Sequence, residues 1–78
     1  MSYTDEDLEK FPKLCALGVP LHRERKGPPG VSWSELAARL PEADLKRFER
    51  WAVGVTTSVN GIYPWDVEDF LAGRAMVD

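Results

Sequence analysis

The chain is poor in the residues from which disulfides, metal sites and catalytic dyads are built. It carries one cysteine, Cys15, and one histidine, His22, in 78 residues. A single cysteine excludes an intramolecular disulfide, and one Cys with one His falls short of the roughly four ligands that zinc takes. Cys15 lies on an expected apolar helical stripe, where a free thiol behaves as a small hydrophobe. We therefore expect no metal, no cofactor and no catalytic residue.

Long apolar runs are also missing. The longest nearly apolar run, LCALGVPL, contains Gly and Pro and is far shorter than the ~20 residues that a membrane-spanning helix needs. The N-terminal segment MSYTDEDLEK is acidic, whereas a secretory signal peptide begins with basic residues. Because the lone cysteine is also compatible with a reducing compartment, these features predict a cytoplasmic protein with no membrane partner.

A strong charge of either sign is absent, since the formal net charge is −3. That value is too small to indicate a nonspecific nucleic-acid binder. The acidic runs within 5–9 and 66–69 do not match the spacing of an EF-hand loop, and favourable charges at helix N-termini explain them better. A phosphate cradle is missing as well, because the prolines of GPPG, residues 27–30, provide no backbone amide donors.

The composition is that of one small globular domain. Apolar residues make up 44% of the chain and aromatic residues 10%, which is typical of a folded protein rather than a disordered one. At this length the core is thin. We expect residues 1–78 to form a single domain.

Two expected helix starts have the spacing of a capping box. Thr4 and Asp7 stand at the N-cap and N3 positions of the first, and Ser32 and Glu35 at those of the second. Pro12 interrupts the first apolar stripe, which predicts either a kinked helix or a second short helix that begins there. The expected apolar positions are Leu8, Phe11 and Cys15 in the first stripe, and Trp33, Leu36, Ala37 and Leu40 in the second.

Residues 18–31, GVPLHRERKGPPGV, are predicted to form a long loop that is rich in Pro, Gly and basic side chains. Such loops are uncommon in small domains and are often functional. We expect His22 to be solvated there.

The C-terminal half predicts two more helices and one hairpin. One helix spans about 41–53, and Pro64 begins a last helix that ends near 72. Between them, β-branched residues flank Asn60-Gly61, the preferred pair of a type I′ turn. Residues 74–78 are expected to form a frayed tail. The predicted fold class is therefore mainly α: a small bundle of three to four short helices with one short β-hairpin near the C-terminus.

The junction between the hairpin and the last helix is the first candidate binding site. Trp65 lies off the apolar stripe of that helix, and Tyr63 precedes Pro64. Aromatic residues and Arg dominate interface hot spots, and a Trp beside acids suits a basic partner. The alternative is that both aromatic rings cap the core. We expect one contact surface at Tyr63, Trp65, Asp66 and Asp69, and another at Arg23, Arg25 and Lys26.

The segment SWSELAARL, residues 32–40, resembles the first helix of a helix-turn-helix, as in excisionase-like and repressor-like domains. The helix that follows offers Lys46, Arg47 and Arg50 as nucleic-acid contacts. Acids share that helix, and LPEAD stands where a glycine-containing turn is usual. Since a recognition helix usually carries more positive charge, DNA binding is the alternative hypothesis.

Residues 31–73, with SWSELAARLPEADLKRFERW and GIYPWDVEDFLAG, resemble short accessory proteins of tailed phages and prophages. The resemblance implies a small protein that binds and modulates a bacterial host protein. The leading hypothesis is a non-enzymatic protein–protein interaction module, a modulator or inhibitor that acts by steric occlusion of a bacterial protein partner.

Overall fold

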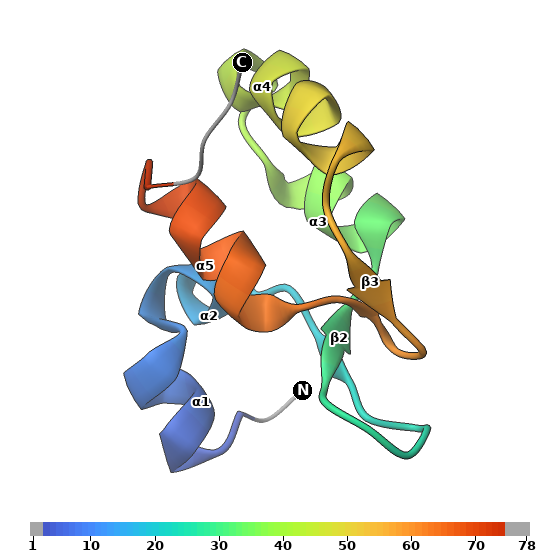
Figure 1. Ribbon diagram of the computed structural model, residues 1–78. Helices are drawn as coiled ribbons and strands as arrows, with labels where there is room; N and C mark the ends of the chain where they lie inside the picture. The colour runs from blue at the N-terminus through green and yellow to red at the C-terminus, as the bar shows by residue number, and fades with distance from the viewer. Residues whose placement is uncertain (1–2, 75–78) are drawn as a thin grey trace.

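The computed structural model describes residues 3–74 (Figure 1). Over that range the chain forms five helices and four strands of two residues each. The helices are α1 (Asp5–Lys10), α2 (Pro12–Leu17), α3 (Trp33–Arg39), α4 (Glu42–Val53) and α5 (Pro64–Leu71). The strands are β1 (Leu21–His22), β2 (Gly30–Val31), β3 (Thr57–Ser58) and β4 (Gly61–Ile62).

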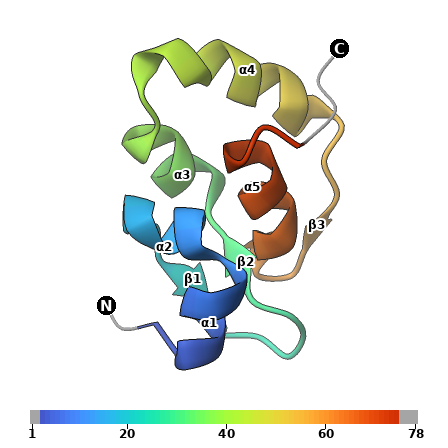
Figure 2. The ribbon, with the colours of Figure 1, turned by 90° about the vertical axis from the view of Figure 1, so that its left-hand side faces the viewer.

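The strands form one antiparallel sheet in the order β1-β2-β4-β3. Leu21 of β1 lies opposite Val31 of β2, and Val31 lies opposite Ile62 of β4. The sheet therefore joins segments from the first half of the chain to segments from the second. Both ribbon views place α1 and α4 at opposite ends of the molecule (Figures 1 and 2).

The predicted helical bundle with one C-terminal hairpin is wrong, because the fold is mixed α and β with strands spread along the chain. β1 and β2 lie inside residues 18–31, where we expected a loop. Leu21 and Val31 are their buried apolar residues. Each strand has only two residues, whereas the period-two alternation that predicts a strand is recognised over about four or more. Only residues 23–29 remain a loop between the two strands.

Glycine permits the central strand pairing. A Cβ at Gly30 of β2 would overlap the backbone of Asn60 and Gly61. Gly61 itself has a φ of 124°, and a Cβ there would lie 2.5 Å from the carbonyl oxygen of Val31. The glycine at position 30, which favoured irregular structure in the sequence, is thus required for the close approach of β2 and β4.

The start and stop signals of the first two helices are confirmed. The Oγ1 of Thr4 accepts from the Asp7 N–H, and the Asp7 carboxylate accepts from the Thr4 N–H, both at 3.1 Å. Pro12 is the first residue of α2, so a separate second helix is the correct alternative. Gly18 caps that helix with a left-handed φ of 76°.

The capping box predicted at Ser32 and Glu35 is wrong, although α3 begins at Trp33 as expected. The Ser32 side chain makes no capping hydrogen bond, and its Oγ lies 3.2 Å from the Oγ of Ser34. The Glu35 carboxylate lies 2.8 Å from Nε2 of His22 in β1. A partner that is distant in sequence has replaced the local one.

The hairpin between β3 and β4 forms, but the predicted type I′ turn at Asn60-Gly61 is wrong. Ser58 pairs with Gly61, so Val59 and Asn60 are the turn residues. A type I′ turn requires positive φ at both turn residues, and no non-glycine residue among residues 3–74 has one.

Buried Asn60 instead ties the hairpin to the β1–β2 loop. Its Oδ1 accepts from the Arg25 N–H at 3.1 Å, and its Nδ2 donates to the carbonyl oxygens of Arg25 at 3.2 Å and Pro28 at 2.9 Å. These three bonds hold the loop against the turn.

Aromatic side chains join α3, α4 and α5. The ring of Phe48 packs edge-on against Trp33, with 5.6 Å between centroids, and against Phe70, with 5.8 Å. Trp51 lies 4.9 Å from Phe70. Aromatic pairs of this kind contribute about 0.5–1.5 kcal/mol beyond their buried area. Besides Phe48 and Phe70, the buried residues of the hydrophobic core are Phe11, Leu14, Val19, Leu21, Val31, Leu36, Leu40, Ala52, Ile62 and Val67.

The beginning of the expected tail is attached to α5. Arg74 donates its backbone N–H to the carbonyl oxygen of Asp69 at 2.8 Å and pairs with the Asp69 carboxylate at 3.0 Å. The remainder of the predicted tail, residues 75–78, lies outside the described residues. Between residues 3 and 74, every helix is too short or too polar to cross a lipid bilayer.

Candidate functional site

Tyr63 and Trp65 form a stacked pair at the surface where α5 begins. Tyr63 is the N-cap residue and buried Pro64 is the first residue of the helix. The two rings lie 4.8 Å apart between centroids, with 16° between their planes. Trp65 is 47% exposed, so the alternative of a core position is excluded for this side chain.

An open hollow of about 530 Å³ lies beside Trp65. Three segments far apart in the sequence form its walls: α1 with the residue after it, the β1–β2 loop, and the start of α5. Its apolar surfaces come from Phe11, Pro29 and Trp65, and its charged lining residues are Glu6, Asp7, Lys10 and Arg23. The structure therefore brings Arg23 and Trp65 together, although the sequence placed them in two separate contact surfaces.

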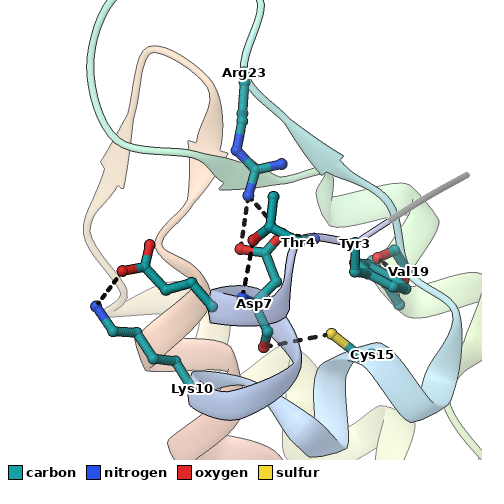
Figure 3. Close-up of polar contacts among 8 residues, drawn as sticks. Tyr3, Thr4, Asp7, Lys10, Cys15, Val19 and Arg23 are labelled. Carbon is teal, nitrogen blue, oxygen red and sulfur yellow. Dashed lines mark hydrogen bonds and ion pairs between the residues drawn. The ribbon is translucent and has the colours of Figure 1, made fainter.

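Arg23 is held in this hollow by Asp7 (Figure 3). Its Nη2 donates to both carboxylate oxygens of Asp7 at 2.7 Å. Burial of Asp7 acts to raise its pKa, but hydrogen bonds from the Thr4 N–H and from Arg23 outweigh burial and hold the pKa below its ordinary value. The Arg23 side chain stays 44% exposed, and its other nitrogens point away from Asp7 (Figure 3).

Helix α1 makes the surroundings of the hollow acidic. Its sequence, DEDLEK, holds four carboxylates and one lysine. Lys10 pairs with Glu6 at 3.4 Å, and both side chains are mostly exposed. Asp5 and Glu9 pair with no cation among residues 3–74. Negative charge therefore remains on α1 after the ion pairs are made.

The two acids expected to accompany Trp65 follow it on α5. Asp69 lies one helical turn after Trp65 and therefore on the same face of the helix, and it pairs with Arg74 at 3.0 Å. Asp66 is half-buried and pairs with no cation in the described part of the chain. Burial, and after it the charge of Asp69, raise the pKa of Asp66. A cation from another molecule would relieve this repulsion.

The other two basic residues of the loop do not line the hollow. Arg25 and Lys26 are exposed and lie in the part of the loop that Asn60 holds against the β3–β4 turn. It is the backbone of Arg25, and not its guanidinium, that makes these hydrogen bonds. The expected second contact surface is thus divided between two places.

The basic residues of α4 also separate. The guanidinium carbon of Arg47 lies 4.1 Å from the ring centroid of Phe70, and its Nη1 donates to the Phe70 carbonyl oxygen at 3.3 Å. Lys46 and Arg50 are exposed, one turn apart. Arg47 therefore packs α4 on α5, while the other two remain accessible.

The lone histidine, which we expected to be solvated, is half-buried and lies between two carboxylates. His22 places Nδ1 2.9 Å from Glu24 and Nε2 2.8 Å from Glu35. Only the doubly protonated ring can donate to two carboxylates. The hydrogen bond to Glu35, followed by the one to Glu24, raises the pKa of His22.

The surroundings of the lone cysteine indicate a structural rather than a chemical role. Cys15 is half-buried, and its thiol lies 3.6 Å from the Asp7 carbonyl oxygen (Figure 3). Burial is the main reason that its pKa is raised. A raised pKa keeps the sulfur as a thiol rather than as the nucleophilic thiolate.

Comparisons of the chain with models of protein families, with curated proteins and with solved structures give no match. Across residues 3–74, no three His, Cys, Asp or Glu side chains come together in a way that could hold a metal ion. The candidate site is therefore defined by its own geometry.

Sequence reasoning missed the α1 side of the hollow. Glu6 and Lys10 have the i,i+4 spacing of a helical ion pair, but that spacing indicates only a stabilised helix. Nothing in the sequence indicated that Phe11 and Pro29 line a site, because they do so only through the packing of α1, the β1–β2 loop and α5 around the hollow. The Asp7–Arg23 pair was also missed, because Asp7 already had a sufficient local explanation as a helix cap.

Proposed function

We propose that this chain is a non-enzymatic protein–protein interaction module that binds its partner at the hollow beside Trp65. The observation that carries the proposal is the convergence of an exposed Trp65, stacked on Tyr63, with Arg23 on one hollow. Trp, Tyr and Arg are the residue types that dominate binding energy at protein interfaces.

The two principal side chains are held in position before any partner binds. Tyr63 supports one face of Trp65, and Asp7 holds Arg23 through two hydrogen bonds. Side chains that are already ordered lose less conformational entropy on association, typically saving about 0.5–1.5 kcal/mol each. This pre-organisation supports the interpretation that Trp65 and Arg23 belong to a binding surface rather than to a surface that only keeps the protein in solution.

The module acts by steric means, since it blocks or recruits its partner rather than changing it chemically. The resemblance to accessory proteins of tailed phages and prophages supports a bacterial host protein as the partner, and inhibition or modulation as the result.

The test is affinity capture from a bacterial lysate with the immobilised full chain, followed by calorimetry with the purified captured protein. Trp65→Ala and Asp69→Lys are expected to weaken binding at least tenfold. Val53→Ala is the matched control, because Val53 is an exposed apolar residue, 86% accessible, on distant α4. Folded Trp65→Ala and Asp69→Lys variants that bind as tightly as the parent chain would overturn the proposed surface.

A second candidate function, DNA binding, is favoured by the connectivity β2-α3-α4-β3-β4. Only Leu40 and Pro41 separate α3 from α4, and the hairpin after α4 pairs through β4 with β2, the strand before α3. This is the connectivity of a winged helix-turn-helix. In helix-turn-helix proteins the second helix enters the major groove of DNA.

The charge of α4 argues against this second candidate. Exposed Glu42 and Glu49 accompany Lys46 and Arg50 on its surface. A gel-shift assay with duplex DNA across a salt series separates the two functions. Salt-dependent retention that Lys46→Glu and Arg50→Glu abolish would establish DNA binding, and no retention at low salt would exclude it.

A further inference from the structure

We propose that the hollow beside Trp65 accepts an arginine or lysine side chain from a basic segment of the partner. This proposal rests on the proposed function and adds the chemistry of the group that is recognised.

The aromatic wall suits a cation. Tyr63 covers one face of the Trp65 indole, while the side chain as a whole is 47% exposed and lines the hollow. Trp is the best aromatic partner for a guanidinium or ammonium group placed over its ring. Phe11 and Pro29 provide apolar surface against which the methylene stem of Arg or Lys can pack while its charged end meets polar groups.

The charges around the hollow favour the same occupant. The two cations that line the hollow are already paired, Lys10 with Glu6 and Arg23 with Asp7. The four charged residues of the lining therefore balance one another. Beyond the lining, Asp5 and Glu9 of α1 and Asp66 of α5 pair with no cation between residues 3 and 74. An incoming positive charge therefore meets a neutral lining between two helices that carry excess negative charge, and complementarity of this kind sets partner choice and association rate.

An acidic occupant is the principal competitor, because Arg23 keeps free donors. Its positive charge is nevertheless balanced by Asp7 at 2.7 Å, and a second carboxylate would add to the acids of α1 and α5. Repulsion between like charges in close contact opposes binding. An acidic occupant would thus gain hydrogen bonds from Arg23, but the negative charge of α1 and α5 would oppose its binding.

The experiment is an NMR titration of the full chain with four capped pentapeptides of the form Ser-X-Ala-X-Ser, where X is Arg, citrulline, Glu or Leu. The signals followed are the Trp65 indole N–H and the backbone amides of Trp65 and Asp69. We expect the Arg peptide to bind at least fivefold more tightly than the other three. Its affinity should fall as the salt concentration is raised from about 50 to about 500 mM, a range over which exposed charges become screened.

Substitutions at and around the hollow test whether the Arg peptide binds there. Trp65→Ala is expected to weaken binding of the Arg peptide at least fivefold. Glu9→Gln combined with Asp66→Asn, which removes two of the unpaired carboxylates, is expected to weaken it at least threefold. The matched control is Glu42→Gln combined with Glu49→Gln, which removes the same charge from distant α4 and should change affinity less than twofold. The dispersion of each spectrum reports whether the variant is folded.

The outcomes separate this proposal from the proposed function. Stronger binding of the Glu or Leu peptide, or equal binding of the Arg and citrulline peptides, would overturn the cationic occupant and leave protein binding at the hollow intact. Absence of Arg-peptide shifts at Trp65 at millimolar concentration would overturn it as well. Loss of protein capture is measured separately, with the captured partner and Trp65→Ala.

Discussion

The carboxylate of Glu68 in α5 accepts the backbone N–H of Leu14 in α2 at 3.0 Å, across a separation of 54 residues. Its other oxygen accepts the N–H of Lys13 at 3.1 Å. Helix α2 has no side-chain cap of its own, and the first N–H groups of a helix have no partner within it. A buried side chain from the far end of the chain therefore serves as its N-terminal cap.

Replacement of Glu68 by Ala is expected to destabilise the fold by about 1–3 kcal/mol, because it leaves two backbone donors of α2 without a partner. Urea denaturation followed by circular dichroism measures the change. Glu49→Ala, at an exposed position of α4, should change stability by less than about 0.5 kcal/mol. Equal effects of the two variants would contradict the capping role.

Replacement of Asn60 by Ala is expected to release the β1–β2 loop from the hairpin. The variant loses the three hydrogen bonds to Arg25 and Pro28, and the loss of stability should be about 1–3 kcal/mol. Hydrogen exchange gives the local readout, since the Arg25 amide should lose protection while amides of α4 keep theirs. Unchanged protection at Arg25 would show that the loop is held by other contacts.

Protonation of His22 is expected to stabilise the fold. Folding raises the pKa of His22 above its ordinary value of 6.5 through Glu35 and then Glu24, so the folded state binds the proton more tightly than the unfolded state. The resulting stability is fully present below about pH 6.5 and is lost as pH rises through the higher folded pKa. Denaturation midpoints measured between pH 5 and 9 should fall over that window. His22→Gln should remove this dependence, and a profile that is unchanged in the variant would assign it to other groups.

Arg47 is expected to act on stability rather than on nucleic-acid binding. Its contact with the Phe70 ring and its hydrogen bond to the Phe70 carbonyl predict that Arg47→Ala destabilises the protein by roughly 1–2 kcal/mol. Lys46→Ala, at an exposed position of the same helix, should change stability by less than about 0.5 kcal/mol. Thermal unfolding of the two variants in parallel measures the difference, and similar midpoints would contradict the packing role.

The candidate site was partly visible in the sequence. Trp65 stood out because it lies off the apolar stripe of its helix, Tyr63 because it directly precedes Pro64, and Arg23 because it lies in a basic loop. Their convergence on one hollow was not visible, since Arg23 is held there by hydrogen bonds to Asp7, which lies 16 residues earlier in the chain. The contact of Arg47 with Phe70 was not visible either, because a guanidinium over an aromatic ring has no signature in the spacing of charges along a helix.

Local energies account for what could be predicted from neighbouring residues. The cap at Thr4, the helix start at Pro64 and the left-handed Gly18 depend on interactions within about four residues, whose geometry the backbone imposes. Those features follow from the local order of amino acids, whereas the start of α2 at Pro12 also uses the distant Glu68.

The sheet and the polar bonds across the fold were decided by tertiary structure. Each strand has two residues, so no strand is stable alone, and the four-stranded sheet is complete only when β2 meets both β1 and β4. Ser32 and Glu35 had the right spacing for a cap, yet Glu35 lies against His22, because a protonated His22 offers the carboxylate an opposite charge that the neutral Ser32 N–H does not. Burial forces each polar group to find a partner, and which partner it meets depends on the packing of the whole chain.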